Sequence, residues 1–141
     1  MLVASGVVSA AVATSLGVEV TEAAGNTDFL REDHSVLALI GLGLMVCVGA
    51  PVGEELFFRG LILQTSAKRW GSSIGIAVST VLFTLIHFVG AGPTDTLILF
   101  AAIGTVGALL GVVTVFFDRL GTAIVIHMTF NSIAFVANSF A

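Results

Sequence analysis

The sequence predicts an all-α, polytopic membrane helix bundle of about five transmembrane helices. Of its 141 residues, 57% are hydrophobic and only 10% are charged, whereas a soluble domain is about 45–50% apolar and roughly 25% charged. The mean hydropathy is +1.11, and the apolar residues gather in runs of roughly the 20 residues that a helix needs to cross a bilayer. Sixteen glycines and two prolines are typical of closely packed membrane helices.

The same composition excludes several classes of protein. Five Lys and Arg against nine Asp and Glu cannot form a surface that neutralises nucleic-acid phosphates, so we expect no nucleic-acid partner. The single cysteine, Cys47, excludes a disulfide scaffold and a cysteine-based zinc site. We expect a multi-pass protein of the cell membrane, whose apolar helices contact membrane lipid.

Five apolar segments follow one another along the chain. Residues 1–18 lack the basic start of a cleaved signal peptide, so we interpret them as a span, followed by an acidic external loop over residues 19–35. The other predicted spans cover residues 36–63, 74–89, 96–117 and 122–140, and the polar stretches between them cover residues 64–73, 90–95 and 118–121. The chain therefore divides into an N-terminal piece, residues 1–35, and a membrane domain, residues 36–141.

Basic residues predict how the spans are oriented. Lys68 and Arg69 lie between the second and third spans, and Arg119 lies between the fourth and fifth. Because cytoplasmic loops of membrane proteins are enriched in Lys and Arg, we expect both of these turns on the cytoplasmic side. The acidic loop and the turn at residues 90–95 then fall outside.

Small residues and one proline predict local features of the spans. Within the predicted spans, glycines lie four residues apart in two pairs, Gly49 with Gly53 and Gly107 with Gly111. Such pairs indicate close contacts between helices. Pro51 leaves the carbonyl of Cys47 without its helical donor, and a break of this kind at membrane depth usually faces a polar cavity.

A few polar side chains interrupt the apolar spans. They are Glu54, Glu55 and Arg59 in the second span, His87 in the third, and His127 and Asn131 in the fifth. An ionisable group inside a membrane helix is costly unless it is paired or hydrated, so such residues mark functional sites. Each also has a structural interpretation, as a protonated buried acid, a histidine bonded to a carbonyl, or a hydrogen bond between helices.

The two glutamates are expected to differ. Glu55 and Arg59 are four residues apart with the acid first, which is the favourable order for an ion pair within one helix. We interpret this pair as mainly structural. Glu54 points roughly 100° away from Glu55 around the helix, so the same arginine cannot easily satisfy it.

Spacing along the chain predicts that the polar groups meet. The midpoint between Glu54 and His87 falls at the centre of the polar stretch 64–73, so the two residues are level across a hairpin. We expect the Glu54 carboxyl and the His87 ring within about 6 Å, where a water molecule can bridge them. Glu54 and His127 lie roughly 13 Å and 9 Å from the cytoplasmic ends of their helices, and Asn131 lies one turn deeper. His127 should therefore complete the cluster.

Three sequence runs carry a resemblance to a known family. EELFFR (54–59), FTLIH (83–87) and HMTFN (127–131) have the forms E-E-x-x-x-R, F-x-x-x-H and H-x-x-x-N. In this order they resemble the CAAX-protease and bacteriocin-processing family of intramembrane endopeptidases, also called the Abi family, and the glycine after Arg59 strengthens the match. The resemblance covers roughly residues 45–137 and makes residues 36–141 the protease domain. The chain looks like a minimal or truncated version, because family members usually carry more N-terminal spans.

The resemblance implies a role for each motif residue in hydrolysis near the cytoplasmic side of the membrane. Glu54 and His87 would hold and deprotonate a water that attacks a peptide carbonyl. His127 and Asn131 would donate hydrogen bonds to the oxyanion that forms. Three residues would support the site. Glu55 and Arg59 would orient the Glu54 helix, and Phe83 would pack against the site and help to exclude water. The substrate would be a peptide or protein, such as a prenylated protein or a leader peptide.

Alternatives to this assignment remain open. Glu54, His87 and His127 form a carboxylate-plus-two-histidine set like that of catalytic zinc sites. The sequence has no H-E-x-x-H pair, so we favour a mechanism without metal or other cofactor. A proton- or ion-coupled transporter is disfavoured because the chain shows no duplicated half. The last alternative is a non-catalytic membrane protein, such as a bacteriocin-immunity factor, that keeps the cluster for binding.

Overall fold

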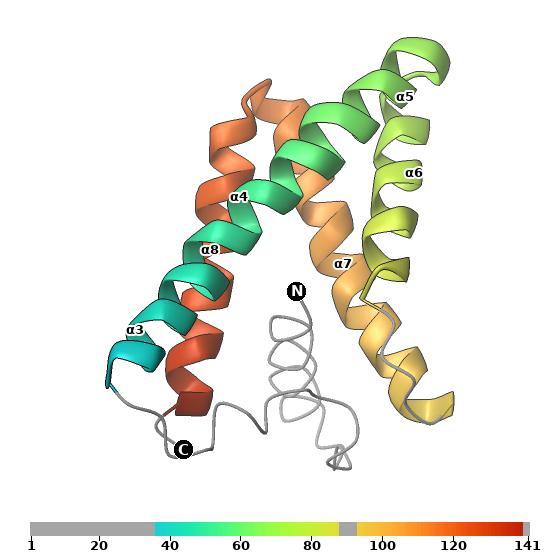
Figure 1. The fold of residues 1–141 in the computed structure, drawn as a ribbon. Helices are drawn as coiled ribbons and strands as arrows, with labels where there is room; N and C mark the ends of the chain where they lie inside the picture. The colour runs from blue at the N-terminus through green and yellow to red at the C-terminus, as the bar shows by residue number, and fades with distance from the viewer. Residues whose placement is uncertain (1–35, 88–92, 140–141) are drawn as a thin grey trace.

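The computed structural model describes residues 36–87 and 93–139, and these two ranges contain helices and turns but no strand. In chain order the helices are α3 (Val36–Leu44), the π-helix η2 (Met45–Gly49), α4 (Ala50–Glu55), the π-helix η3 (Leu56–Leu63), α5 (Gln64–Trp70), α6 (Ser72–Leu85), α7 (Pro93–Phe117) and α8 (Leu120–Ser139). The predicted all-α class is therefore confirmed (Figure 1).

Three helices are long and apolar enough to cross a membrane. They are Val36–Trp70, which joins α3 through α5 in one helix of 35 residues, Thr96–Phe117 and Leu120–Ala137. Ser72–Leu85 is apolar but shorter. The chain is thus a membrane protein. The expected span at residues 1–18 and the acidic loop at 19–35 lie outside the described residues, as does the first part of the expected turn at 90–95.

The hairpin between α5 and α6 turns where the sequence predicted its centre. Gly71 has φ +88°, a conformation that glycine adopts without steric cost, and α6 starts at the next residue. The prediction that residues 64–70 belong to a polar turn is wrong, because they form helix α5. The run QTSAKRW contains no glycine or proline, so nothing ends the helix before Gly71.

Two further helix ends differ from the predicted ones. Helix α7 starts at Pro93 rather than at residue 96, because proline is well tolerated at the first position of a helix, where its missing N–H would have no partner. Helix α8 starts at Leu120, which shortens the predicted turn 118–121 to two residues. Asp118 has φ +50° there, a left-handed conformation that aspartate adopts more readily than most residues.

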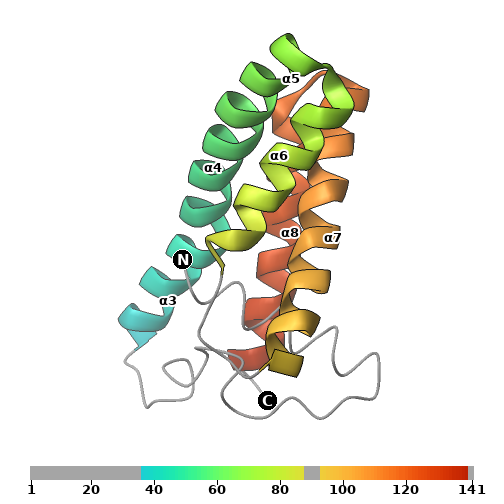
Figure 2. The same ribbon diagram turned by 90° about the vertical axis from the view of Figure 1, so that its right-hand side faces the viewer.

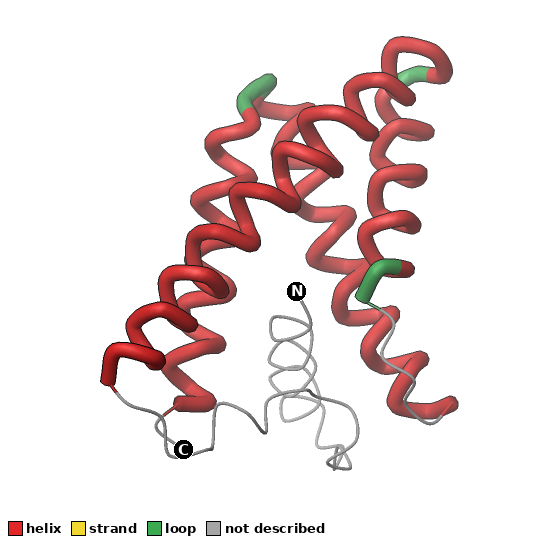
Figure 3. Tube along the Cα trace, viewed as in Figure 1, coloured by secondary structure: helices red, strands yellow, loops and turns green. Residues whose placement is uncertain are grey.

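The helices pack as a bundle around α6 and α8. Helix α6 packs against η3, α5 and α7, while α8 packs against η2, α4 and α7. Figure 2 shows α6 between the long helix Val36–Trp70 and α7, with α8 behind. The turns that join α5 to α6 and α7 to α8 lie at the same end of the bundle (Figures 1 and 3). One end of the bundle therefore carries Lys68, Arg69 and Arg119. This agrees with the prediction that both turns lie on the same side of the membrane.

Glycines decide how closely the helices approach. A Cβ atom on Gly75 would lie 2.9 Å from both the backbone nitrogen of Ala67 and the carbonyl oxygen of Leu63, so α6 can lie this close to the long helix only because residue 75 is glycine. A Cβ on Gly107 would lie 3.1 Å from the Phe83 ring, and one on Gly111 would be similarly tight against α6. The predicted contact of this second glycine pair is confirmed.

The first glycine pair makes no close contact with another helix among the described residues. A Cβ atom on Gly53 would meet no described atom within 4 Å, and one on Gly49 would meet only the carbonyl oxygen of Leu44, in its own helix, at 3.9 Å. The described helices therefore do not supply the contact that the sequence predicts at Gly49 and Gly53.

Candidate active site

The two glutamates lie on a short α-helical segment between two π-helices. Helix α4, which ends at Glu55, is preceded by η2 and followed by η3. In η2 the hydrogen bonds run to the fifth residue back, as the bond from Ala50 N–H to the Met45 oxygen illustrates. Such π-helical turns inside helices are frequent at functional sites, where they change the direction of side chains.

Asn131 closes the backbone gap that the proline opens. In the register of η2, the carbonyl of Val46 would accept from residue 51, and Pro51 has no N–H to donate. Asn131 Nδ2 donates to the Val46 oxygen instead, at 2.9 Å. The sequence pointed to Cys47 as the carbonyl without a donor, and the π-helical register moves this role back by one residue.

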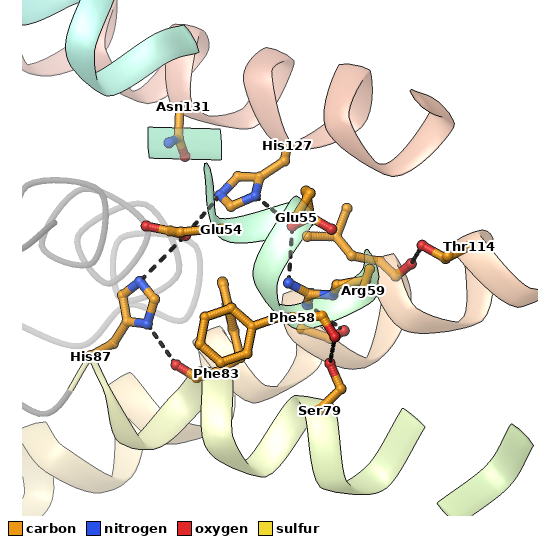
Figure 4. Close-up of polar contacts among 12 residues, drawn as sticks. Glu54, Glu55, Phe58, Arg59, Ser79, Phe83, His87, Thr114, His127 and Asn131 are labelled. Atoms are coloured by element: carbon orange, nitrogen blue, oxygen red, sulfur yellow. Dashed lines mark hydrogen bonds and ion pairs between the residues drawn. The ribbon is translucent and has the colours of Figure 1, made fainter. Parts of the chain in front are cut away.

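Glu54 faces two histidines, one in the turn that follows α6 and one in α8. Its Oε2 atom lies 3.9 Å from His87 Nε2 and 3.8 Å from His127 Nε2, as Figure 4 shows. These distances are too long for direct hydrogen bonds. The Glu54 side chain is only 6% exposed, and neither of its oxygens has a hydrogen-bond partner among the described residues. The predicted approach of Glu54 and His87 within about 6 Å is confirmed, and His127 joins them as expected.

The tautomer of His87 follows from its other ring nitrogen. His87 Nδ1 lies 2.7 Å from the carbonyl oxygen of Phe83, and because a carbonyl only accepts, Nδ1 carries the hydrogen. The neutral ring then turns an unprotonated Nε2 toward Glu54. The Phe83 ring packs against both histidines, with centroid distances of 4.6 Å to His87 and 6.0 Å to His127.

Glu55 belongs to a buried network of its own. Its Oε1 accepts from Arg59 Nη1 at 2.9 Å and from His127 Nδ1 at 2.8 Å. Arg59 also donates from Nη2 to the carbonyl oxygen of Gly107 at 2.8 Å and lies over the Phe83 ring at 4.4 Å. The predicted ion pair of Glu55 and Arg59 is confirmed, and both side chains are fully buried. The bond from His127 to Glu55 was not predicted.

Sequence reasoning missed Gly75 and Ser79, which continue the spacing of Phe83 and His87 back along α6. The four residues lie four positions apart and are all buried. Ser79 Oγ donates to the carbonyl oxygen of Phe58 at 2.9 Å, a carbonyl in the π-helix η3, and this bond ties α6 to the long helix. The four-residue spacing of small and polar residues that leads to His87 could have predicted that this side of α6 is buried.

An apolar pocket adjoins Glu54. It has a volume of about 360 Å³ and is lined by Gly49, Ala50, Gly53, Glu54, Phe57, Phe58 and Ile86. Among the described residues of this lining, Glu54 is the only ionisable one. The pocket therefore lies beside the first glycine pair, and its wall includes Glu54, whose carboxyl group faces the two histidines.

The three residues of the zinc alternative, Glu54, His87 and His127, lie together. The part of the chain that the structure describes contains no group of three His, Cys, Asp or Glu that could hold a metal ion. His87 and His127 each bond through Nδ1 to an oxygen and turn Nε2 toward Glu54. The distances of 3.8 and 3.9 Å also suit a water molecule that bridges Glu54 and the histidines.

A comparison of the sequence with known proteins identifies the family. Residues 36–133, well over half of the chain, match the family described as Type II CAAX prenyl endopeptidase Rce1-like. No curated protein and no solved structure matches the chain. The matched range contains all three motifs and every residue of the cluster around Glu54. The chain therefore belongs to the Rce1-like family of type II CAAX prenyl endopeptidases and is a CAAX-type intramembrane protease.

Proposed function

We propose that the protease hydrolyses its substrate through a water molecule activated directly by Glu54, without a metal ion. One observation carries this proposal: the buried Glu54 carboxylate, which lacks a hydrogen-bond partner among the described residues, faces the Nε2 atoms of His87 and His127 at 3.9 and 3.8 Å. A carboxylate in this position can accept a proton from a water held between it and an imidazole.

The first step is the activation of water by Glu54 and His87. A water between Glu54 Oε2 and His87 Nε2 can donate one hydrogen to each, since the carboxylate accepts and the Nε2 of the neutral ring carries a lone pair. Glu54 takes one proton as the water oxygen bonds to the scissile carbonyl carbon. The protonated Glu54 then returns this proton to the leaving amine as the carbon–nitrogen bond breaks.

The oxyanion of the tetrahedral intermediate would be stabilised from α8. His127 and Asn131 lie one turn apart on this helix and on the Glu54 side of it (Figure 4). Asn131 Nδ2 carries two hydrogens, and its bond to the Val46 oxygen uses one of them. The second hydrogen is available to a substrate oxygen. Preorganised donors of this kind each lower a barrier by about 3–4 kcal/mol.

His127 can donate from Nε2 only when both of its ring nitrogens are protonated, because Nδ1 already donates to Glu55. The bond from Nδ1 to Glu55 would fix the orientation of the ring, so that a hydrogen on Nε2 points at the oxyanion.

We place the reaction near the cytoplasmic side of the membrane. Lys68, Arg69 and Arg119 lie at one end of the bundle, and the positive-inside tendency of membrane proteins puts such an end in the cytoplasm. The substrate would be a peptide segment that reaches the bilayer, such as the tail of a prenylated protein or a leader peptide.

A peptidase assay with purified protein in detergent tests this function. The assay compares wild type with Glu54→Gln, on prenylated CAAX peptides and on leader-type peptides. Losing the general base should lower turnover by about 10²–10⁴-fold, while Asp118→Asn, an acid-to-amide change in the turn between α7 and α8, should leave turnover unchanged. Wild-type turnover in Glu54→Gln would contradict the proposed role of Glu54. A wild type that binds but never cleaves these peptides would favour the non-catalytic alternative.

A further inference from the structure

The pocket beside Glu54 exists because two residues of the long helix lack side chains. Gly49 and Gly53 form part of its wall, and a Cβ atom on Gly53 would extend into space free of described atoms for 4 Å. Phe57, Phe58 and Ile86 supply apolar walls. A larger residue at either glycine would therefore take up space in the pocket.

The pocket is suited to an apolar group that belongs to the substrate. Its volume of about 360 Å³ exceeds the ~150 Å³ of a dry cavity that holds one benzene molecule, so a large side chain fits. Glu54 forms part of the pocket wall, and its carboxyl oxygens are buried and have no hydrogen-bond partner among the described residues. A group in the pocket therefore lies next to the residue that would activate the water.

Resting on the proposed function, we propose that this pocket binds the apolar side chain of the substrate residue that directly flanks the scissile bond. Gly49 and Gly53 set the size of side chain that the pocket accepts. They are therefore specificity-determining residues of this protease, although the sequence pattern alone marks them as a helix contact. Binding of this side chain fixes the distance between the scissile carbonyl and Glu54.

The choice of a peptide side chain over a membrane lipid follows from the position of Glu54. The carboxylate and the two histidines act only on a carbonyl within hydrogen-bond reach of the activated water. A substrate side chain in the pocket is covalently joined to that carbonyl and holds it in the reactive position. A lipid chain in the pocket would instead keep the substrate side chain out. The mainly apolar lining favours an aliphatic or aromatic side chain and disfavours a charged one.

The test varies the pocket and the substrate together. Two peptides differ only at the residue beside the scissile bond, with Leu in one and Ala in the other, and kcat/KM is measured for both with wild type, Gly53→Leu and Gly41→Leu. Gly41 is the matched control, since it lies on the same helix, a Cβ on it also meets no described atom within 4 Å, and it does not line the pocket. Thermal unfolding of each variant checks its fold.

The expected result is a change of preference in one variant only. Wild type and Gly41→Leu should prefer the Leu peptide, and Gly53→Leu should lower this preference by about 10-fold or more, as expected for filling an apolar subsite. Gly49→Ala and Gly53→Ala, which add a single methyl group, should lower the preference for the Leu peptide by a smaller factor. These two variants test the proposal if Gly53→Leu does not fold. Preference unchanged in all pocket variants would overturn the assignment of this pocket. A wild type that cleaves neither peptide would contradict the proposed function itself.

Discussion

Glu55 Oε1 accepts a hydrogen bond of 2.8 Å from His127 Nδ1, although the two residues are 72 positions apart in the sequence. The other nitrogen of the same ring, Nε2, lies 3.8 Å from Glu54 Oε2. One imidazole therefore stands between two adjacent glutamates, and these glutamates have different surroundings. Glu55 is held by Arg59 and His127, whereas Glu54 faces the pocket and the two Nε2 atoms.

The first prediction concerns Glu55 as the residue that positions His127. Glu55→Gln removes the carboxylate that orients the His127 ring. We expect kcat to fall on the order of 10²-fold or more, as when the orienting acid of a catalytic histidine becomes an amide, with KM nearly unchanged. The measurement is steady-state kinetics well below the melting temperature. Unchanged kcat in a protein of lower thermal stability would show that Glu55 is only structural.

The second prediction concerns Arg59, which is fully buried. Arg59→Ala leaves the Glu55 carboxylate without its cation and the Gly107 carbonyl without its donor. Breaking a buried ion pair in this way costs about 3–5 kcal/mol, so folding yield and melting temperature should fall more than the turnover of the protein that folds. Arg59→Lys should recover only part of the loss, because one ammonium cannot reproduce both bonds of the planar guanidinium. Normal yield and stability with abolished turnover would instead place Arg59 in the catalytic step.

The third prediction concerns Asn131, which has two roles. Asn131→Ala should lower turnover by roughly 10²–10³-fold through the loss of an oxyanion donor, with little change in substrate binding. It should also lower the free energy of unfolding by about 1–3 kcal/mol, because the Val46 carbonyl loses its donor. Asn131→Asp, which keeps the shape but removes both N–H groups, should show both effects. A stability loss with unchanged turnover would remove Asn131 from the oxyanion site.

The fourth prediction concerns the close approach of α6 to the long helix. A Cβ on Gly75 would lie 2.9 Å from backbone atoms of Ala67 and Leu63, so Gly75→Ala should destabilise the fold by about 1–3 kcal/mol, the usual cost of overpacking. Gly41→Ala is the matched control, since a Cβ there meets no described atom within 4 Å. Thermal unfolding in detergent compares the two variants. Equal melting temperatures would mean that α6 moves away without cost.

Regular helix geometry was sufficient to predict the helical class and the proximity of Glu54 and His87. The positions of the helices follow from the length of the apolar runs in the sequence. Whether two residues lie opposite each other in a hairpin follows from where the chain turns. The polar run at residues 64–70 misled the prediction of the helix end. Polar residues near a membrane surface remain helical when no glycine or proline interrupts them.

The contacts that sequence reasoning missed depend on rotations that helical periodicity does not supply. The π-helices η2 and η3 change the hydrogen-bond register on both sides of α4, and this change made Val46, not Cys47, the partner of Asn131. The bond from His127 to Glu55 depends on how α8 is rotated about its axis against α4. The spacing of Gly49 and Gly53 equals that of Gly107 and Gly111, and only packing distinguishes a pocket wall from a helix contact.

The last prediction separates direct catalysis by Glu54 from catalysis by a metal. If Glu54 activates the water and His127 and Asn131 bind the oxyanion, activity should survive extensive chelation and dialysis. Under the alternative, Glu54, His87 and His127 would hold one zinc ion, which would polarise the water or the carbonyl. Chelators would then inactivate the enzyme reversibly. Direct metal analysis of the purified wild type and of Glu54→Gln, His87→Ala and His127→Ala decides between the two mechanisms. One tightly held zinc per active chain, lost in all three variants, would overturn the metal-free mechanism and leave the protease assignment in place.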